Sequence, residues 1–355
     1  MKIAILAPLT RPAHPDTRGS RPRLVYDLVR ILVQKDHAVT TFGPGDSKVP
    51  GKLIKVSPKS IYLLPKAENP FYQHTVYLAK LIEAISKKAK EFDIIHNHVY
   101  PEFLPVLISP FIKTPMLTTI HLPITEPMAE LLRHYPQTFF TTVSDNQRRG
   151  IKGVNFIGTV YNGVDTSEFP FKREKGEYLL FFGRMKEGDP KGVEIAIKIA
   201  QKIGENLKIA GNVESPVFYK KEIEPHLNNK IQFIGPVDPV GPIGFEEKVR
   251  LYQNARALLF PIQWEEPFGM TMIEAMSCGT PVIAFAKGAV KEVILDGKTG
   301  SICPAGNIEA MTEAVEKIDQ IDRVSCREHV KNNFTIERMV DEFEKIYQKI
   351  LSKNA

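Results

Sequence analysis

Short apolar runs alternate with amphipathic segments along the first half of the chain, and this alternation constrains the fold more than any other feature. Residues 2–7 form the first apolar run, and apolar side chains then recur at helical spacing over residues 22–35. Later runs predict strands over residues 39–42, 93–96, 116–120, 139–143 and 156–161, with a helix over 74–90. Strands that alternate with helices in this way predict an α/β fold, in which helices cover both faces of a parallel sheet.

The same alternation starts again in the second half. We expect strands over residues 178–182, 207–210, 231–234, 257–260 and 281–284, a helix over 193–203, and a terminal amphipathic helix over 335–349. Between the halves, residues 165–176 are polar and contain proline, as is typical of a linker. The chain has 355 residues, which is more than the roughly 250–300 that one hydrophobic core spans. The sequence therefore predicts two domains, residues 1–165 and 166–334, followed by a C-terminal helix over 335–355.

The composition is that of an ordinary soluble protein, with 43% hydrophobic and 25% charged residues and no apolar run near the roughly 20 residues of a membrane span. We find no targeting segment and expect a cytoplasmic protein. Cys278, Cys303 and Cys326 are odd in number and widely spaced, which indicates buried thiols rather than disulfides or a metal site. His96 and His98 lie two positions apart but lack a third ligand at a suitable spacing, so no metal is expected.

The net charge of +6 is divided unevenly between the halves. Residues 1–165 hold 21 Lys and Arg against 13 Asp and Glu, whereas residues 166–355 hold 26 against 28. The resulting charge of +8 on the first half suggests an anionic partner there, although a solvated surface is the commoner explanation of such an asymmetry. We expect no nucleic-acid partner.

The densest cluster of unusual residues lies between Glu265 and Pro281, directly after a predicted strand. Gly269 and the helix that follows it direct backbone N–H groups and the positive end of a helix dipole toward an anion such as a diphosphate. Glu266 and Glu274 stand eight positions apart, one before the helix and one about two turns along it, where each accepts hydrogen bonds from paired hydroxyls. Sugars and riboses carry such hydroxyls. The alternative is an ordinary acidic helix on the surface.

In this context the sequence resembles the retaining glycosyltransferases of the large family that includes bacterial-type sucrose and glycogen synthases, because Glu266 and Glu274 match its Glu-x7-Glu motif. The resemblance implies a GT-B architecture, with two facing Rossmann-like domains, a cleft between them and a C-terminal helix that returns to the first domain. It also implies that Glu266 binds hydroxyls of the donor sugar and Glu274 those of the ribose. By the same resemblance, the backbone lies near the sugar at Phe268, Gly269 and Met270, and near the diphosphate at Thr271 and Met272.

A second cluster follows the first strand of the second half, over residues 182–192. Two cations beside a glycine-rich turn suit a diphosphate leaving group, because negative charge grows on it as the glycosidic bond breaks. The resemblance assigns this task to Arg184 and Lys191, and an ordinary surface pair is the alternative. The loop is longer than the family pattern, so Lys186 is a second candidate for the phosphate lysine. We favour Lys191 because a glycine follows it.

In the first half, His121 follows an apolar strand, at the edge where Rossmann-like sheets bind ligands. The resemblance places a matching histidine beside the reacting sugar carbon, whereas a lone histidine near a strand end is otherwise more often structural. His96 and His98 follow another strand in the same manner. We assign His98 to the cleft and His96 to packing, and the reverse assignment stays open.

The loop after the first strand departs from the family pattern. The family commonly carries a Gly-Gly pair that approaches the donor diphosphate, and here only Gly19 remains. Four arginines crowd the same region: Arg11, Arg18, Arg21 and Arg23. They favour an anionic acceptor or an additional phosphate contact, or else they solvate the loop and pair with acids. Our candidates for the acceptor side are therefore Arg18, Arg21 and His98.

These features predict an enzyme that transfers a hexosyl unit from a nucleoside diphosphate sugar, its co-substrate, to an acceptor hydroxyl without a further cofactor. The predicted catalytic residues are His121, Arg184, Lys191 and Glu266. No carboxylate is evident as a nucleophile, so we expect front-face substitution. The acceptor is left open among an anionic glycan, a lipid and a small molecule, as is peripheral contact with a membrane. Two rival hypotheses are a GT-B-like sugar-nucleotide epimerase and a sugar-nucleotide-binding protein without activity.

Overall fold

The computed structural model describes residues 1–17, 20–65, 67–236 and 243–354, without the side chains of Ser20 and Asn354. The chain divides into two compact units. Unit 1 comprises Met1–Asn162 and Ile336–Ala355, and unit 2 comprises Gly163–Thr335. The first division thus falls after residue 162, where the sequence predicted a boundary at 165.

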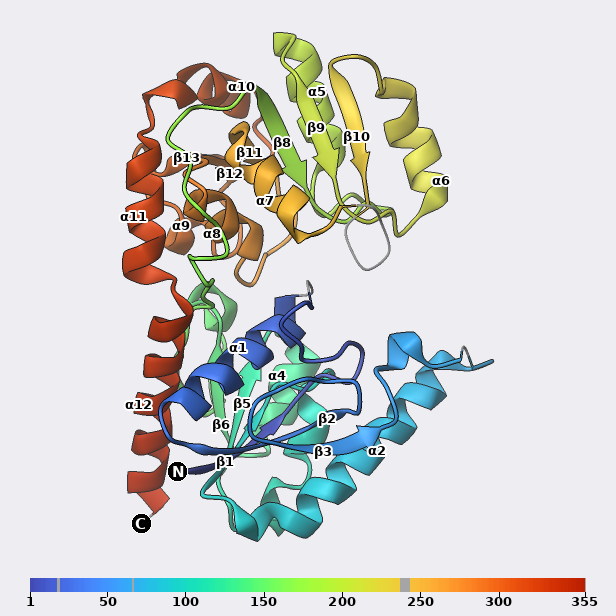
Figure 1. Ribbon diagram of the computed structural model, residues 1–355, viewed down its shortest axis with the longest axis vertical. Helices are drawn as coiled ribbons and strands as arrows, with labels where there is room; N and C mark the ends of the chain where they lie inside the picture. The colour runs from blue at the N-terminus through green and yellow to red at the C-terminus, as the bar shows by residue number, and fades with distance from the viewer. Residues whose placement is uncertain (18–19, 66, 237–242, 355) are drawn as a thin grey trace. The chain divides into compact units, whose positions relative to one another are not determined.

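Unit 1 is built on a seven-stranded sheet in which every strand pair is parallel. The strand order is β3-β2-β1-β4-β5-β6-β7, so the direction in which strands are added reverses between β1 and β4 (Figure 1). In this register Leu6 pairs with Phe42 of β2 and with Asn97 of β4. The strands are β1 (Lys2–Leu6), β2 (Ala38–Pro44), β3 (Lys52–Ser57), β4 (Ile94–Asn97), β5 (Met116–Ile120), β6 (Phe139–Thr142) and β7 (Phe156–Thr159).

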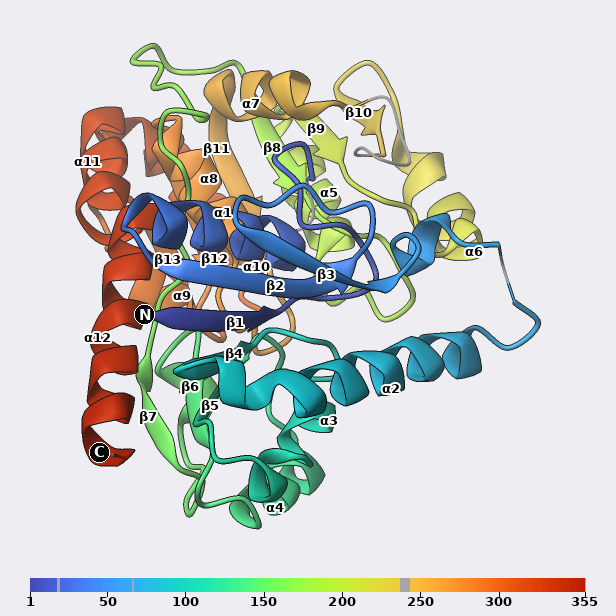
Figure 2. The ribbon, with the colours of Figure 1, turned by 60° about the horizontal axis from the view of Figure 1, so that its bottom comes forward.

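Helices cover both faces of this sheet, and Figure 2 shows α1 and α2 on opposite sides of it. The α-helices of unit 1 are α1 (Ser20–Gln34), α2 (Pro70–Lys88), α3 (Phe103–Val106), α4 (Glu126–Arg133) and α12 (Ile336–Asn354). Short 3₁₀ turns accompany them: η1 (Ile61–Leu63), η2 (Ala89–Glu91), η3 (Ser109–Phe111) and η4 (Asn146–Arg148).

The α2 helix shows how local sequence defines these elements. The Asn69 side chain accepts a hydrogen bond from a backbone N–H of the first turn, and Pro70 suits that turn because it needs no N–H partner there. Leu78, Leu81 and Ile85 recur at helical spacing and are buried in the core beneath the sheet. Each buried aliphatic side chain contributes about 1.5–3 kcal/mol, against about 1 kcal/mol for the cap. Burial of this face therefore decides the placement of α2.

The C-terminal helix α12 belongs to unit 1, although unit 2 precedes it in the chain. It packs against α1, and the ammonium of Lys35 bonds Asp341 Oδ1 at 2.7 Å and Glu344 Oε2 at 2.5 Å. Tyr347 and Ile350 on the same helix are completely buried. The expected return of the last helix to the first domain is thus confirmed.

Unit 2 is built on a six-stranded sheet, also parallel throughout. Its order is β10-β9-β8-β11-β12-β13, so the reversal lies between β8 and β11. The strands are β8 (Tyr178–Phe182), β9 (Leu207–Ala210), β10 (Ile231–Gly235), β11 (Ala255–Phe260), β12 (Val282–Phe285) and β13 (Gly300–Cys303).

The helices of unit 2 include α5, which is bounded by two glycines in the left-handed region, Gly192 with φ 81° and Gly204 with φ 69°. Such backbone favours glycine because it has no Cβ. The α-helices are α5 (Val193–Ile203), α6 (Pro216–Phe218), α7 (Phe245–Gln253), α8 (Met270–Ser277), α9 (Val290–Val293), α10 (Ile308–Lys317) and α11 (Arg323–Asn333). The shorter turns are the π-helical η5 (Tyr219–Ile223) and the 3₁₀ turns η6 (Glu224–His226) and η7 (Ile318–Gln320).

The sequence analysis missed two strands, β3 and β13. Each forms an edge of its sheet, where only one neighbouring strand is present. An edge strand buries less side-chain area, so its apolar pattern is weaker: Lys52 and Lys55 of β3 are exposed, and β13 begins with Gly300.

The three cysteines are free and buried, as predicted. Burial raises the pKa of Cys278 and of Cys326 to about 12, and that of Cys303 to about 11. These thiols therefore remain protonated at neutral pH and have little nucleophilic character. Over the residues that the structure describes, no helix combines the length and the apolar character needed to cross a membrane.

Arg323, at the start of α11, ties together several loops of unit 2. Its buried guanidinium donates to the backbone oxygens of Lys172, Gln253 and Ala255 and to Thr280 Oγ1, each at 2.9 Å. The planar fork of an arginine serves several acceptors at once, whereas an ammonium is a compact point charge on a flexible stem. The side chain therefore satisfies carbonyl groups that would otherwise be buried without partners.

We expect Arg323→Lys to lower the free energy of unfolding by about 2–3 kcal/mol, because an ammonium leaves some of these buried acceptors unpaired. Denaturant unfolding measures this loss. The matched control is Arg250→Lys, since Arg250 is 60% exposed and its partners lie at the surface; its effect should stay within about 0.5 kcal/mol. Equal losses in the two variants would contradict the structural role of Arg323.

Candidate functional site

The strand reversal between β8 and β11 defines the ligand-binding edge of unit 2. In a parallel sheet, loops that leave the carboxyl ends of adjacent strands diverge at such a reversal, which leaves a crevice for ligands. The two loops here are residues 183–192 after β8 and 261–269 after β11. They contain Arg184, Lys191 and Glu266, which the sequence analysis selected, and Glu274 lies in the helix that follows the second loop.

Lys191 and Glu266 come together across this reversal. The ammonium of Lys191 donates to Glu266 Oε2, and the indole Nε1 of Trp264 donates to the same oxygen at 3.0 Å. The ammonium also lies 5.1 Å from the centroid of the Trp264 ring. Across the described part of the chain, both hydrogen bonds of the Glu266 side chain use Oε2. Oε1 is therefore the oxygen on which this carboxylate can accept a ligand hydroxyl.

Gly269 begins the α8 helix in the left-handed region, with φ 86°. A Cβ on this residue would lie 2.6 Å from Met272 Cε and 3.2 Å from Phe260 Cζ, so a larger residue would need both to move. Met270 and Thr271 in the first turn are half-buried. The first N–H groups of a helix lack intrahelical acceptors, so this turn directs donors and positive dipole toward the loop side.

Glu274 lies within α8 and is buried, unlike a residue of an ordinary surface helix. Lys248 Nζ donates to its Oε1 at 2.7 Å, and Tyr252 Oη donates to its Oε2 at 2.8 Å. Burial and the adjacent Glu274 carboxylate raise the pKa of Tyr252 well above its ordinary value, so the phenol remains a donor. Each carboxylate oxygen has a second lone pair, and Glu274 therefore retains capacity for a diol.

The two predicted cations of the loop after β8 differ in their exposure and in their ion-pair partners. Arg184 is 54% exposed and forms a surface ion pair with Glu214 at 3.1 Å. Such a pair contributes little and breaks easily, so the guanidinium can turn to a ligand. Lys191 is 17% exposed and contacts Glu266, whereas no ion pair between Lys186 and Glu266 occurs over the described residues. The geometry favours Lys191 over Lys186 as the site lysine.

Asp189 explains the length of this loop. Its buried carboxylate accepts hydrogen bonds from the backbone N–H groups of Gly192, Val193 and Glu194, each at 2.9 Å. The N-terminus of α5 is therefore already occupied by an anion of the chain itself. Gln263 then binds the loop to the neighbouring one, since its side-chain amide donates to the Asp189 carbonyl at 2.8 Å. These bonds hold Lys191 beside Glu266.

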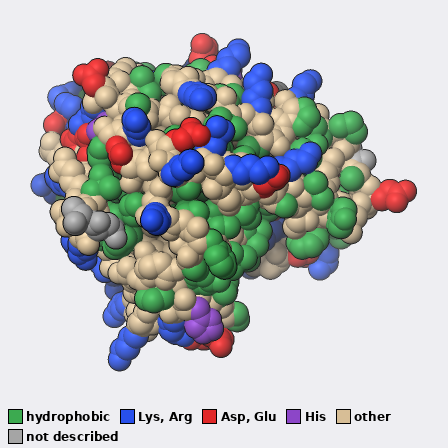
Figure 3. All heavy atoms as spheres, turned by 90° about the horizontal axis from the view of Figure 1, so that it is seen from below, with side chains coloured by type: hydrophobic (Ala, Val, Ile, Leu, Met, Phe, Trp, Pro, Cys, Tyr) green, Lys and Arg blue, Asp and Glu red, His purple; other side chains and the backbone are tan. Residues whose placement is uncertain are grey.

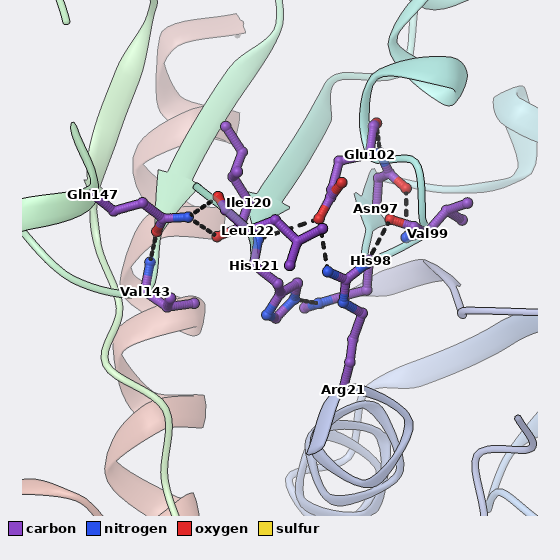
Figure 4. Close-up of polar contacts among 10 residues, drawn as sticks. All are labelled: Arg21, Asn97, His98, Val99, Glu102, Ile120, His121, Leu122, Val143 and Gln147. Carbon is purple, nitrogen blue, oxygen red and sulfur yellow. Dashed lines mark hydrogen bonds and ion pairs between the residues drawn. The ribbon is translucent and has the colours of Figure 1, made fainter. Parts of the chain in front are cut away.

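In unit 1, the corresponding edge gathers three histidines. His98 follows β4 and His121 follows β5, and His121 Nε2 lies 3.0 Å from His98 Nδ1 (Figure 4). His96, in β4, is completely buried and contacts Thr119 Oγ1 at 2.7 Å and Tyr347 Oη at 2.6 Å. His121 is half-buried. His96 is thus a packing residue, and His121 is the histidine of the three that retains accessible surface.

Burial keeps these histidines neutral. It lowers the pKa of His98 to about 3, with a further contribution from the positive charge of Arg21. Burial also lowers the pKa of His96 and of His121 well below the ordinary value of 6.5. Near neutral pH each ring therefore carries one proton and offers one donor and one acceptor.

Arg21 stands in the same region but its charge is balanced. Its Nη2 lies 2.8 Å from Glu102 Oε1, and both side chains are largely buried (Figure 4). The backbone N–H of His121 donates to the same carboxylate oxygen at 3.4 Å. The ion pair thus belongs to the framework around His121, which differs from the free acceptor-binding charge that the sequence analysis proposed.

The other loop arginines also form local contacts. Arg23 Nε bonds Asp27 Oδ2 at 2.7 Å, and the Arg11 guanidinium lies 5.2 Å from the centroid of the Tyr62 ring. The predicted site residues Arg18 and Gly19 lie outside the described residues. Figure 3 shows basic side chains in several separate groups on the face that it draws. Arg11, Arg21 and Arg23 therefore have partners within the chain itself.

Several residues of the two sites were missed from the sequence. Glu102, Lys248 and Tyr252 contact Arg21 or Glu274 from other elements. Trp264 contacts Glu266 from within the same loop, and Asp189 bonds backbone N–H groups next to Lys191. Only two signals were present: Trp264 is the single tryptophan and stands two residues before Glu266, and Asp189 stands just before a predicted helix. Within the described ranges, no group of three or more His, Cys, Asp and Glu side chains is arranged to hold a metal ion.

Two family models match adjoining parts of the chain. The model described as Glycosyltransferase Family 4 matches residues 22–168, and the model described as Glycosyl transferases group 1 matches residues 165–333. Together they cover most of both units, including Lys191, Glu266, Glu274, His98 and His121, whereas Arg21 and Tyr347 lie outside the matched residues.

Similar proteins extend over nearly the whole chain. N-acetyl-alpha-D-glucosaminyl L-malate synthase of Bacillus anthracis is 25% identical over 92% of this chain and 92% of its own. The structure of sucrose-phosphate synthase from Thermosynechococcus elongatus superimposes with a TM-score of 0.78 at 19% identity and covers 99% of both chains. That of Anabaena Alr3699/HepE in complex with UDP and glucose gives 0.72 at 15% identity, over 98% of this chain and 99% of the other. These likenesses establish the GT-B fold.

The histidine cluster predicts a pH-dependent stability. Because the folded state lowers the pKa of His98 to about 3, the unfolded state takes up a proton more readily between about pH 6.5 and pH 3. The stabilisation is therefore complete above pH 6.5 and is lost as the pH falls through this window. We expect the free energy of unfolding of unit 1 to fall by up to about 1.4 kcal/mol per pH unit for each such histidine.

The measurement is denaturant unfolding at a series of pH values, and His98→Asn should show a shallower slope than the parent protein. The exposed His226 provides the control, because His226→Asn removes a histidine that solvent surrounds in both states. A slope that His98→Asn leaves unchanged would mean that the cluster is not the source of the acid sensitivity.

Proposed function

The chain belongs to the family 4 glycosyltransferases of GT-B fold, and we propose that it transfers a hexosyl unit from a nucleoside diphosphate sugar to an acceptor hydroxyl with retention of the anomeric configuration. The observation that carries this proposal is the meeting of Lys191 with Glu266 at the strand reversal of unit 2. A cation and a carboxylate held together suit a ligand that joins a diphosphate to a polyhydroxylated ring.

In the proposed donor complex, the diphosphate lies at the first turn of α8, where backbone N–H groups and the helix dipole favour an anion. Lys191 and Arg184 neutralise it, and the weak surface pair of Arg184 with Glu214 opens to permit this. Glu274 accepts from the ribose hydroxyls, and Glu266 accepts from the sugar through Oε1. The structure of Alr3699/HepE with UDP and glucose supports a nucleotide and a sugar as ligands of this fold.

The proposed reaction is front-face substitution. The acceptor oxygen forms a bond to the anomeric carbon on the face from which the diphosphate departs, and the bond between that carbon and the diphosphate oxygen breaks. The acceptor proton passes to a diphosphate oxygen, which carries the electron pair of the broken bond. Lys191 and Arg184 stabilise the charge that grows there, and His121 of unit 1 contributes a neutral contact to the transferred sugar.

The acceptor of the proposed reaction is a hydroxyl compound that carries negative charge. The relative from B. anthracis is named for L-malate, a small anionic hydroxy acid, which supports this class. Because Arg21 is already paired with Glu102, the recognition of such an acceptor falls to groups other than Arg21.

Incubation with UDP-, GDP- and ADP-sugars, followed by detection of slow hydrolysis, tests the proposed function. Isomerised sugar nucleotide without free diphosphate would indicate an epimerase instead.

The leaving-group role predicts that Lys191→Ala lowers turnover by a factor on the order of 10²–10³, as the loss of one charge stabiliser in a transition state does. The substitution should leave the fold intact, because Lys191 is not part of the core. Lys186→Ala is the matched control from the same loop and should retain most of the activity. Full activity in Lys191→Ala with loss in Lys186→Ala would move the phosphate contact to Lys186.

Substitutions of Glu266 and Glu274 are expected to differ in their effect on nucleotide affinity. Glu274→Gln should weaken the binding of a free nucleoside diphosphate in calorimetry, because the ribose contact belongs to the nucleotide. Glu266→Gln should leave that affinity nearly unchanged and reduce turnover of the sugar nucleotide. Equal losses of nucleotide affinity in both variants would contradict the assignment.

A further inference from the structure

A chain of hydrogen bonds connects the C-terminal helix to His121. Tyr347 Oη on α12 lies 2.6 Å from His96 Nδ1, and His98 Nε2 lies 3.3 Å from the same nitrogen. His98 Nδ1 in turn lies 3.0 Å from His121 Nε2. On its other side, His96 Nε2 lies 2.7 Å from Thr119 Oγ1. Every member except His121 is buried, so solvent does not supply alternative partners.

The Tyr347 hydroxyl determines the direction of the first bond. The phenol is completely buried, and burial raises its pKa well above 10, so it keeps its proton. Over the described residues, His96 Nδ1 is the one hydrogen-bond partner of this hydroxyl. A buried O–H without an acceptor is costly, so the phenol donates to Nδ1. His96 then carries its single proton on Nε2 and donates it to Thr119.

The direction of this bond passes along the chain. His96 Nδ1 presents a lone pair to His98 Nε2, and two lone pairs at 3.3 Å would repel each other. His98 therefore carries its proton on Nε2 and presents a lone pair at Nδ1. By the same argument, His121 carries its proton on Nε2 and donates it to His98. The remaining nitrogen, His121 Nδ1, is left with a lone pair.

We propose that Tyr347 is a positioning residue that acts through His96 and His98 to fix His121 in the tautomer protonated at Nε2. In this tautomer His121 Nδ1 is an acceptor only. It accepts a hydrogen bond from a ligand hydroxyl and repels an acceptor-only group such as a phosphate or carboxylate oxygen. The tautomer follows from unit 1 alone, whereas its effect on sugar recognition rests on the proposed function.

The C-terminal helix is well placed for this task. Lys35 and His37 hold α12 through Asp341 and Glu344, with His37 Nε2 2.7 Å from Glu344 Oε1. Phe343, one turn before Tyr347, packs edge-on against His96 with ring centroids 4.7 Å apart. Phe343 thus orients the same imidazole without any hydrogen bond, and it provides a matched comparison for the hydroxyl of Tyr347.

The direct test is nitrogen NMR of the full chain labelled with [15N]histidine at neutral pH, with the His121 signals identified from a His121→Gln sample. Protonated and unprotonated ring nitrogens resonate in separate ranges. We expect His121 Nε2 in the protonated range and His121 Nδ1 in the unprotonated range. The opposite pattern, or two averaged signals in the parent protein, would overturn the proposal without any need for a variant.

Tyr347→Phe removes the hydroxyl and keeps the ring. We expect the two His121 signals to move toward each other as the tautomers mix, and Phe343→Leu, which alters the packing alone, should leave them separate. Unchanged signals in Tyr347→Phe, or the same mixing in Phe343→Leu, would overturn the role of Tyr347. Thermal unfolding of both variants identifies any loss that is due to stability.

An activity measurement links the tautomer to recognition. Tyr347→Phe should lower kcat/KM for the sugar nucleotide by a factor of up to about ten, because one hydrogen bond contributes about that much. The affinity for the free nucleoside diphosphate should stay unchanged. Mixed His121 signals together with unchanged kcat/KM would refute the effect on recognition and leave the tautomer assignment standing. Absence of any sugar-nucleotide turnover in the parent protein would refute the proposed function, whereas the NMR result would still decide the tautomer.

Discussion

The parallel pairing of β8 with β11 is the constraint on which the proposed donor site of unit 2 depends. Strands that pair in parallel bring their carboxyl ends to one edge, and the reversal of strand order lets the two loops diverge there. Lys191 and Glu266 are 75 positions apart, yet they meet because they lie in the loops that follow these two neighbouring strands. The pairing in turn depends on apolar strands that are buried on both faces, such as Leu179 to Phe181.

At the candidate sites of both units, the described side chains that bury a charge have partners. Glu274 meets Lys248 and Tyr252, Arg21 meets Glu102, and the Asp189 carboxylate meets three backbone N–H groups. Burying an unpaired charge is costly, so each of these groups is held in one position by the need to keep its partner. This pairing fixes the positions of the buried side chains at both sites. The ion pair of Arg184 with Glu214 lies at the surface, where an unpaired charge is solvated, so Arg184 can leave its partner.

The sequence predicted the strands, helices and site residues that local patterns define. It missed the residues whose role depends on a partner far away in the chain. Strands β5, β8 and β9 and helix α5 were predicted at their observed bounds, because central apolar runs and flanking glycines are local signals. Glu266 and Lys191 were selected because their type and spacing match a chemical task. Lys248, Tyr252 and Tyr347 could not be selected, since an ordinary lysine or tyrosine gains its role only from a distant partner. For the same reason, the sequence analysis proposed Arg21 as a charge for binding the acceptor. Glu102, which neutralises Arg21, lies 81 residues further along the chain.

The Lys191–Glu266 pair of unit 2 is charged and the three histidines of unit 1 are neutral, and this difference has one physical cause. In unit 2, half-buried charges face a loop that solvent reaches, so the Lys191–Glu266 pair can exchange its contacts for those of an ionic ligand. In unit 1, burial removes the charge from His96, His98 and His121, and what remains is the direction of each hydrogen bond. The direction of each hydrogen bond survives burial, because every proton in a closed chain of hydrogen bonds needs one acceptor. The charge of the rings does not survive burial. A neutral chain of this kind distinguishes donors from acceptors without adding charge, which suits the uncharged sugar ring of the proposed substrate.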